Sequence, residues 1–562
     1  MSFYDDASLV FLPSGGAGKD TKAYSIKPTN GDGDFTFSRG SNLTATRIDS
    51  NGLIEKGREN LLVNSVWDGV TTDTKPTGWS SQLVSGTGTF DVTATEGQIR
   101  FQTLDASSRA FISSPTITTN GIVVVSVYVD EVNTTLPLNN LLKRSSNATD
   151  LFAYEDGVEI NYSDNVQAGK RYSVVFNKTG STNFRFGVGA SDVALGDVVL
   201  SKPQIEVGLV ATEWITSPIG STGKAGLLEN EPRFDYSGGA SCPSLLPEPS
   251  RTNLIEYSEY FEGSGWTAQS GITLTANTTE TLSPEGLNNA YKVVSTDATK
   301  GFYFSGLSIT NAAVRTIYLK GAVGGETIVF KDPSGFGTPS TKTLTTDWQR
   351  FEMATTNDGN TYQGLFIDDI SVGTIYAFGA QMEEGSNSSS YIPNHSGGSV
   401  TRDADITSVT SVSDLIGQTE GTIYCEFEYN GAADTGVFNR IIGLGTGVTQ
   451  NRILLAKNDT TAELVAFAVT GGTTQVFQAI SGTSIIGHHK VAISYKANEY
   501  KVYLDGELEF TDSSASVPAT TDVYIGTAED GTTDNELGGV VKQSIIFKEV
   551  LSEDNCKALT TI

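Results

Sequence analysis

Two glutamates in the segment CEFEYNG, Glu426 and Glu428, are the nearest approach in this sequence to a hydrolytic acid pair. They stand two residues apart in an expected strand, so both side chains fall on one face. Enzymes that cleave glycosidic bonds use two such carboxylates. A third acidic residue, as in the pattern E-x-D-x-x-E, is missing from this stretch. We therefore interpret Glu426 and Glu428 as ordinary carboxylates on a strand face.

The three histidines offer no better catalytic arrangement. His395 follows YIPN in an expected loop, and His488 and His489 are adjacent at the start of an expected strand. Adjacent strand residues point to opposite faces, so His488 and His489 cannot easily share one ligand. The sequence has no HExxH motif and no credible Ser-His-Asp arrangement. We expect structural or surface roles for these side chains and no catalytic residue.

Oxygen donors gather in the acidic stretch AEDGTTDNE, residues 528–536. Carboxylate and carbonyl oxygens are the ligands that calcium prefers in proteins. Asp530, Asp534 and Glu536 are therefore the candidate calcium ligands, and we expect no other cofactor. The alternative is a plain acidic turn, because neither this stretch nor NGDGD (Asn30–Asp34) follows the complete twelve-residue calcium loop.

Exposed aromatic rings are the side chains that stack on sugars, with amides and carboxylates beside them. The candidates are Trp67, Trp79, Trp214, Trp266 and Trp348. Trp79 and Trp266 hold matching places in an internal repeat, and Trp348 starts an expected strand, so packing is the favoured interpretation for these three. The loops Asn439–Asn451 and Thr527–Gly538 are candidate rims of a ligand site.

The internal repeat indicates which elements position these residues. GRENLLVNSVWDGVTTDTKPTGW, residues 57–79, resembles SRTNLIEYSEYFEGSGW, residues 250–266. Three further pairs of residues match in the same order: Tyr128 with Tyr318, Arg171 with Arg350, and Gln204 with Gln381. The separation between the two members of a pair decreases along the chain, as deletions in loops would produce. Four collinear pairs predict two copies of one domain.

The residues kept at the start of both copies suit a structural role. An arginine and an asparagine would hold the entering chain, and a tryptophan would close the first loop. Glu256, Tyr257 and Glu259 of the second copy have no counterpart of the same chemistry in the first. We predict a latch that opens each sandwich, formed by Arg58, Asn60 and Trp79 in the first copy and by Arg251, Asn253 and Trp266 in the second.

Short stretches of period two, separated by Gly, Asn, Asp and Ser, predict many antiparallel strands. Both copies contain them, and the last third adds the hairpin KVAISYK-ANE-YKVYLDG and a short terminal helix capped by Ser552. The sequence predicts an all-β fold with three β-sandwich (jelly-roll) domains in series. The expected boundaries are an extended N-terminal attachment arm at 1–56, sandwich 1 at 57–220, a linker at 221–250, sandwich 2 at 251–400 and sandwich 3 at 401–562.

Bulk composition excludes several classes of partner. A net charge of −28 argues against nucleic acid and against an anionic membrane surface. The cysteines Cys242, Cys425 and Cys556 are odd in number and far apart, so we expect free thiols. No apolar window of 18 residues occurs, and the first residues lack a basic region, so we expect neither a membrane span nor a signal peptide.

Three long segments resemble, in order, those of a recurrent family of tailed-bacteriophage virion proteins. The segments are FTFSRGSNLTATRIDSNGLIE (Phe35–Glu55), EPRFDYSGGASCPSLLPEPSRTNLIEYSEYF (Glu231–Phe261) and GAQMEEGSNSSSYIPNHSGGSVTRDADI (Gly379–Ile406). The C-terminal stretch KVAISYKANEYKVYLDGELEF is similar to that family's concanavalin-A-like (laminin-G-like) lectin domain. A sandwich resembling a carbohydrate-binding module usually precedes this domain, and the second such sandwich here departs from the usual arrangement.

The resemblance implies a structural protein of the virion, most often a tail fibre or tail-associated protein, made in the host cytoplasm. Its implied partners are other virion proteins through the arm, further copies of itself with a trimer favoured, and a host-surface glycan bound multivalently. One alternative is a decoration protein of the capsid surface or head fibre. Another is a polysaccharide depolymerase, which requires the acid pair that the sequence lacks.

Overall fold

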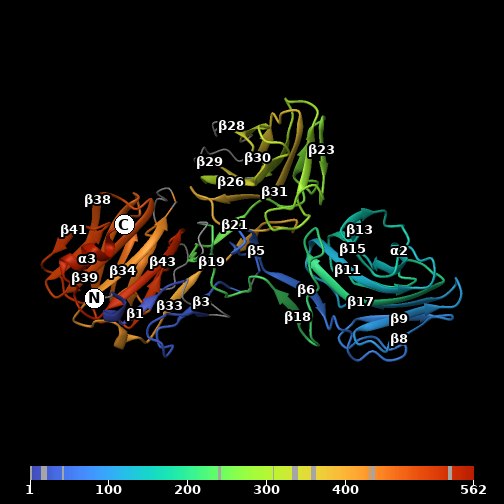
Figure 1. Cartoon of the computed structure of the whole chain (residues 1–562), viewed down its shortest axis with the longest axis horizontal. Coiled ribbons are helices and arrows are strands. Elements are labelled where there is room, and N and C mark those ends of the chain that lie inside the picture. Colours follow the sequence, from blue (N-terminus) through green and yellow to red (C-terminus); the bar gives the residue numbers. More distant parts are fainter. Residues whose placement is uncertain are drawn as a thin grey trace.

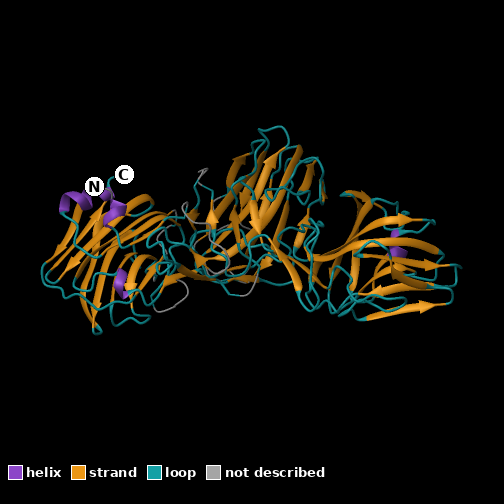
Figure 2. Cartoon of the chain, turned by 60° about the horizontal axis from the view of Figure 1, so that its bottom comes forward, coloured by secondary structure: helices purple, strands orange, loops and turns teal. Residues whose placement is uncertain are grey.

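The computed structural model describes residues 3–13, 22–40, 43–237, 242–307, 309, 311–331, 339–355, 363–429, 431, 437–529 and 535–562. Within this part of the chain most elements are β-strands, and they form three β-sandwiches (Figures 1 and 2). Helices are short: α1 (Phe3–Asp6), α2 (Leu138–Leu141), a 3₁₀ turn (Ser413–Leu415) and α3 (Glu553–Thr560). No described helix is long and apolar enough to cross a membrane. The predicted all-β fold class is confirmed.

Sandwich 1 packs a seven-stranded sheet, in the order β14-β13-β15-β11-β17-β9-β8, against a four-stranded sheet, β12-β16-β10-β7. Its strands are β7 (Ser81–Ser85), β8 (Thr89–Val92), β9 (Gln98–Thr103), β10 (Arg109–Ser113), β11 (Gly121–Val132), β12 (Leu142–Arg144), β13 (Ala148–Glu155), β14 (Val158–Ile160), β15 (Lys170–Lys178), β16 (Phe184–Val188) and β17 (Gly196–Val207). A two-stranded ribbon of β6 (Arg58–Val63) and β18 (Thr222–Ala225) joins the entry and exit of the sandwich.

Sandwich 2 repeats this plan with two five-stranded sheets, β22-β25-β30-β27-β28 and β23-β24-β31-β26-β29. Its strands are β22 (Trp266–Ala268), β23 (Ile272–Thr275), β24 (Tyr291–Ser295), β25 (Phe302–Leu307), β26 (Ala313–Gly321), β27 (Thr327–Lys331), β28 (Ser340–Thr343), β29 (Gln349–Thr355), β30 (Gln363–Asp368) and β31 (Gly373–Glu384). A ribbon of β21 (Arg251–Asn253) and β32 (Val400–Arg402) again joins entry and exit.

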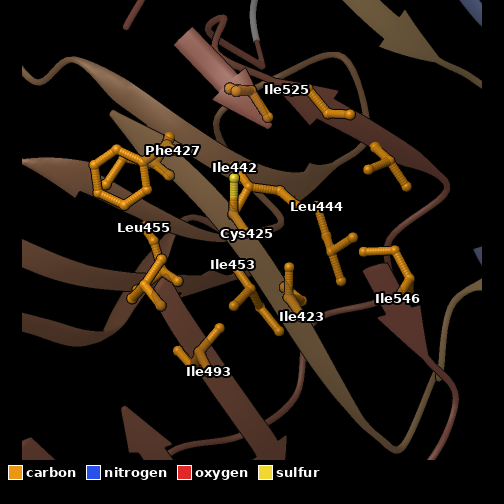
Figure 3. Close-up of a cluster of buried hydrophobic side chains, with 14 of the residues drawn as sticks. Ile423, Cys425, Phe427, Ile442, Leu444, Ile453, Leu455, Ile493, Ile525 and Ile546 are labelled. Carbon is orange, nitrogen blue, oxygen red and sulfur yellow. The ribbon is translucent and has the colours of Figure 1, made fainter. Parts of the chain in front are cut away.

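Sandwich 3 consists of two eight-stranded sheets, one in the order β19-β20-β43-β34-β39-β40-β41 with β1 also on β43, the other β2-β3-β33-β42-β35-β36-β37-β38. Its C-terminal strands are β33 (Ile406–Val409), β34 (Glu420–Tyr429), β35 (Arg440–Gly445), β36 (Arg452–Lys457), β37 (Glu463–Thr470), β38 (Thr473–Ser484), β39 (Gly487–Lys496), β40 (Glu499–Leu504), β41 (Glu507–Asp512), β42 (Asp522–Ile525) and β43 (Val540–Phe547). Figure 3 shows side chains from both sheets meeting in its core, among them Ile423, Phe427, Ile442 and Ile493.

The first two sandwiches share hydrogen bonds as well as strand order. Arg171 donates to the Ser126 hydroxyl at 2.8 Å, and Arg350 donates to the Thr316 hydroxyl at 3.0 Å. The amide of Ser65 donates to the carbonyl of Ser217 at 3.0 Å, and that of Ser258 to Asn394 at 2.6 Å. The strand pairs β11·β17 and β26·β31 also carry a register shift at the same place, Ser126/Tyr128 and Thr316/Tyr318. The two sandwiches are therefore two copies of one structural unit.

The segment predicted as a free N-terminal arm contributes strands to sandwich 3. β1 (Leu9–Phe11) pairs with β43, and β2 (Lys22–Ala23) and β3 (Phe35–Ser38) extend the other sheet. Leu9 and Phe11 face the main core and Val10 faces a second cluster beside α3. An unattached arm would leave these three apolar side chains in water, at a cost of about 25 cal/mol per Å². The N-terminus consequently lies beside the C-terminus in Figure 1.

The predicted linker is extended but also ordered within the fold. β19 (Phe234–Asp235) pairs with β20 (Ser244–Leu245), whose Leu245 pairs with Val541 of β43. A hairpin of β4 (Thr46–Ile48) and β5 (Ile54–Lys56) packs Ile54 against Phe378 and Tyr391 of sandwich 2. The three sandwiches are thus joined by segments that leave and re-enter sandwich 3.

A buried ionic hub, defined as Arg39, Arg233, Glu248, Arg402 and Asp405, fastens these connecting segments together. The three arginines are at most 1% exposed. Arg39 lies 3.3 Å from Asp405, and Glu248 lies 2.6 Å from Arg233 and 2.9 Å from Arg402. Arg233 also pairs with Asp405. Burial alone would raise the pKa of Glu248, but Arg402 and Arg233 lower it overall and keep the carboxylate charged.

Candidate functional site

The structure places the candidate catalytic carboxylates on the outer face of β34, each beside a cation or histidine. Glu426 lies 2.8 Å from Nε2 of His488, and Glu428 lies 3.1 Å from Nζ of Lys542. His489 instead pairs with Asp505, at 2.7 Å from Nδ1. The adjacent histidines thus bind separate carboxylates, as the alternation of strand faces predicts.

The calcium prediction falls mostly outside the described residues. Asp530 and Asp534 lie there, and the third candidate, Glu536, has a side chain with no exposed surface. Among the residues that the structure describes, no group of three His, Cys, Asp or Glu side chains is placed to hold a metal ion. The calcium site therefore stays a prediction.

The tryptophans mostly serve packing. Trp67, Trp79 and Trp266 are at most 8% exposed and lie in the cores of sandwiches 1 and 2. Trp348 packs on the cluster that holds the β4–β5 hairpin. Trp214 is half-buried, and its indole donates to the carbonyl of Pro203 at 3.3 Å. The described tryptophans therefore offer no fully open sugar platform.

The latch residues fall into two groups. Asn60 donates to the carbonyls of Pro203 and Ile215 and accepts from the amides of Leu62 and Ile205. Asn253 does the same at the matching positions Ala380, Ile392, Ile255 and Met382. Trp79 and Trp266 likewise donate to the matching carbonyls of Val63 and Glu256. The arginines differ, because Arg58 pairs with Glu285 whereas Arg251 donates to the carbonyl of Ser250.

A shallow hollow lies on the outer face of sandwich 3, over β35–β38. The hollow has a volume of about 70 Å³ and is lined by Phe438, Arg440, Arg452, Leu454, Val465, Phe467 and Phe477. Leu454, Phe467 and Phe477 stand opposite one another on three neighbouring strands. Alternate residues of these strands, such as Ile453 and Val476, fill the core, so the period of two directs this row outward.

Aromatic rings form one side of the hollow. Phe477 is 54% exposed, and its ring stands edge-on to Phe467 at 5.5 Å and to Phe438 at 6.0 Å. The guanidinium of Arg452 lies 4.6 Å from the centre of the Phe467 ring, a cation–π geometry. An apolar ring held this open on a sheet face is available for stacking.

Charged groups form the other side of the hollow. Glu529 lies 3.0 Å from Nε of Arg440 and also pairs with Arg452. Burial alone would raise the pKa of Glu529, but Arg440 and then Arg452 lower it overall, so the carboxylate stays ionised. Glu529 itself is 3% exposed, so its role is to hold the two arginines in place. The hollow therefore combines apolar rings with the fixed donors of Arg440 and Arg452, a combination that sugar sites use.

Sequence reasoning came close to this hollow without naming its central residues. Arg440 lies in the stretch Asn439–Asn451 and Glu529 in Thr527–Gly538, both predicted as ligand rims. The phenylalanines are absent from the sequence prediction because it considers only tryptophans as stacking residues. Phe467 in ELVAFAVT and Phe477 in TTQVFQAI occupy outward positions of alternating strands. A large aromatic residue at a strand position where the alternation predicts an exposed polar side chain would have indicated this site.

Comparisons with known proteins give fold likenesses only. No family model and no curated protein matches the chain. The CBM40 of Ruminococcus gnavus IT-sialidase is 17% identical, over 27% of this chain and 91% of that one, at a TM-score of 0.23. The CBM22-1–CBM22-2 tandem of Paenibacillus barcinonensis Xyn10C is 10% identical, over 62% and 99%, at 0.21. Domains LG4-5 of the mouse laminin α1 chain are 11% identical, over 44% and 88%, at 0.17.

These structural neighbours are carbohydrate-binding modules and laminin G-like domains. At such TM-scores they carry no argument about the ligand of this chain. None of these three is a bacteriophage protein, and the resemblance to virion proteins stays a prediction.

Proposed function

We propose that this protein binds glycans without cleaving them, through the hollow on the outer face of sandwich 3. The observation that carries this proposal is the exposed ring of Phe477 in a hollow that Phe467, Arg440 and Arg452 also line. A sugar ring presents an apolar face that stacks on an aromatic side chain, while its hydroxyls bond to charged groups alongside. Glu529 is buried and held in ion pairs with both arginines, which suits a group that positions them more than a general acid.

The proposal extends to the setting implied by the resemblance. In that setting the protein is a structural component of a phage virion, in the tail or on the capsid surface, and several copies bind a host glycan together. Multiple weak sites would then act through their effective concentration. The proposal includes self-association and attachment to other virion proteins, because the resemblance implies both.

A glycan array tests the proposed function. We expect the wild-type protein to bind a defined set of oligosaccharides, and Phe477→Ala to weaken each by about tenfold, because stacking contributes roughly 1 kcal/mol beyond buried area. Leu83→Ala is the matched control, since Leu83 is an exposed apolar residue on β7 of sandwich 1, and it should bind normally.

Two outcomes contradict the proposal. One is an array without any binding by the wild-type protein, and the other is equal binding by wild type and Phe477→Ala. A reducing-sugar assay on the bound oligosaccharides checks the non-enzymatic part, because release of sugar would favour a depolymerase.

A further inference from the structure

A second cleft lies where sandwiches 1 and 2 meet the segment that enters sandwich 1. Its volume is about 380 Å³, inside the range of roughly 300–1,000 Å³ typical of small-molecule sites. Its walls include Lys56 and Arg58 of the entering segment, Thr119 and Asn120 of sandwich 1, and His395 in the exit loop of sandwich 2. Three separate parts of the chain therefore converge on one cleft.

His395 is the unusual group in this cleft. Its side chain is 5% exposed, and neither ring nitrogen has a hydrogen-bond partner among the described residues. The nearest carboxylate oxygen, on Glu259, lies 3.6 Å from Nε2. Buried polar groups are almost always hydrogen-bonded, and an unsatisfied one costs about 1–3 kcal/mol. A ligand in the cleft would remove this cost.

The charges around His395 balance. Lys56 lies 3.0 Å from Glu259 and 2.6 Å from Glu285, and Arg58 lies 3.2 Å from Glu285. Burial, followed by Lys56, lowers the pKa of His395 to about 3, so its imidazole is neutral at neutral pH. Two cations pair with two carboxylates beside a neutral ring, so this cluster by itself carries no net charge.

The internal repeat shows that this cluster is not needed to build a sandwich. The matched bonds Ser65–Ser217 and Ser258–Asn394 align the two copies residue by residue at this point. The next positions are Val66 and Pro218 in sandwich 1, where sandwich 2 has Glu259 and His395. The same backbone therefore forms without either polar side chain.

We propose that this cleft binds a neutral, polyhydroxylated ligand of sugar size, with a hydroxyl group bonded to His395. A neutral imidazole has one donor and one acceptor nitrogen, and a hydroxyl group can serve either. The other walls carry the carboxylates Glu59, Glu206 and Glu229, which disfavour an anionic ligand. This site is separate from the hollow of sandwich 3 and does not depend on its function.

The three histidines of the chain allow a direct test by nitrogen-15 NMR of imidazole side chains. The probes are N-acetyl-D-glucosamine, methyl β-D-galactoside and methyl α-D-glucoside, each titrated into the full-length protein. We expect at least one of them to shift the ring nitrogens of His395 saturably. The rings of His488 and His489, which already have carboxylate partners, should stay unchanged.

Two variants sharpen the test. His395→Phe removes the proposed bond, and Asn120→Trp fills the cleft from its exposed rim without altering the buried cluster. Isothermal titration calorimetry measures binding by both variants, because His395→Phe has no imidazole to observe. Each should weaken binding by about tenfold or more, which corresponds to about 1.4 kcal/mol. Phe477→Ala should leave this binding unchanged, which distinguishes the cleft from the hollow.

The proposal is overturned if none of the three probes shifts the His395 nitrogens, since water alone would then occupy the cleft. It is also overturned if Asn120→Trp binds as tightly as the wild type. Should His395→Phe fail to fold, Asn120→Trp alone decides.

Discussion

At the residue scale, two asparagines explain why the chain repeats a phrase. Asn60 and Asn253 are fully buried, and each satisfies four backbone groups in its own sandwich. An amide is the right group because one end donates twice and the other accepts twice. The sequence indicates a structural role for the phrase, but it gives the arginine and the asparagine equal weight in the predicted latch. Arg58 and Arg251 have different partners because only one of them lies next to Glu285.

Replacing Asn253 by Ala should destabilise sandwich 2 by about 3 kcal/mol, because buried donors and acceptors lose their partners. Hydrogen–deuterium exchange of peptides from β21 and β31 should show this loss. Thr252→Ala is the control. Thr252 is the half-exposed neighbour of Asn253, and its replacement should change the stability by no more than about 0.5 kcal/mol. Equal exchange in both variants would remove Asn253 from the latch.

His395 makes the stability of sandwich 2 depend on pH. Burial and then Lys56 lower its pKa to about 3 in the folded protein, whereas the unfolded chain has about 6.5. Between these values the unfolded state binds the extra proton, so stability is complete above pH 6.5 and falls as the pH is lowered. The expected loss is about 2 kcal/mol at pH 5.

Calorimetry at pH 7 and pH 5 measures this loss. His395→Asn should show a smaller decrease than the wild type, because it has no group to protonate in this range. His488→Gln should keep the wild-type decrease. A wild-type decrease that persists in His395→Asn would assign the pH dependence to other groups.

At the element scale, alternation predicted strands well but could not predict which sandwich they join. The stretch LVF at Leu9–Phe11 is apolar on both faces, but the glycine-rich sequence after it favours an arm when only local sequence is considered. Its partner, β43, is more than 500 residues away, and nothing local in the sequence reports such a pairing. The same alternation predicts that the phenylalanines of β37 and β38 point outward, once it is known which residues of each strand face the core.

Phe11→Ala should destabilise sandwich 3 by about 3–4 kcal/mol, the usual cost of truncating a buried phenylalanine. Phe11 has no exposed surface, and its ring lies 5.1 Å from that of Phe35. Thermal unfolding measures the effect on stability, and hydrogen–deuterium exchange of peptides from β43 shows where it occurs. Thr36→Ala, an exposed position on β3, serves as control, and an unaffected β43 in Phe11→Ala would restore the free-arm interpretation.

At the scale of the whole molecule, the ionic hub fastens the connecting segments to the junction between sandwiches 2 and 3. Arg39 and Glu248 lie in connecting segments, and Arg402 and Asp405 join sandwich 2 to sandwich 3. These residues belong to the segments that resemble virion proteins. Their types were visible in the sequence, but their convergence was not, because it depends on the return of the linker to sandwich 3.

Asp405→Asn should destabilise the junction by about 3–5 kcal/mol, because Arg39 and Arg233 stay buried without their full countercharge. Small-angle scattering should show a larger radius of gyration, and the peptide 228–237 should exchange faster. Asp403→Asn makes the same charge change two residues away at an exposed position, and it should leave both measurements unchanged. An unchanged radius in Asp405→Asn would mean that the hub does not hold the sandwiches together.

A crystal structure with the tightest-binding oligosaccharide from the array tests the central claim, glycan binding on sandwich 3, most directly. We predict density for a sugar ring stacked against Phe477, with hydroxyl groups within hydrogen-bonding distance of Arg440 or Arg452. Density for the oligosaccharide elsewhere on the molecule, with the hollow over β35–β38 empty, would contradict this account.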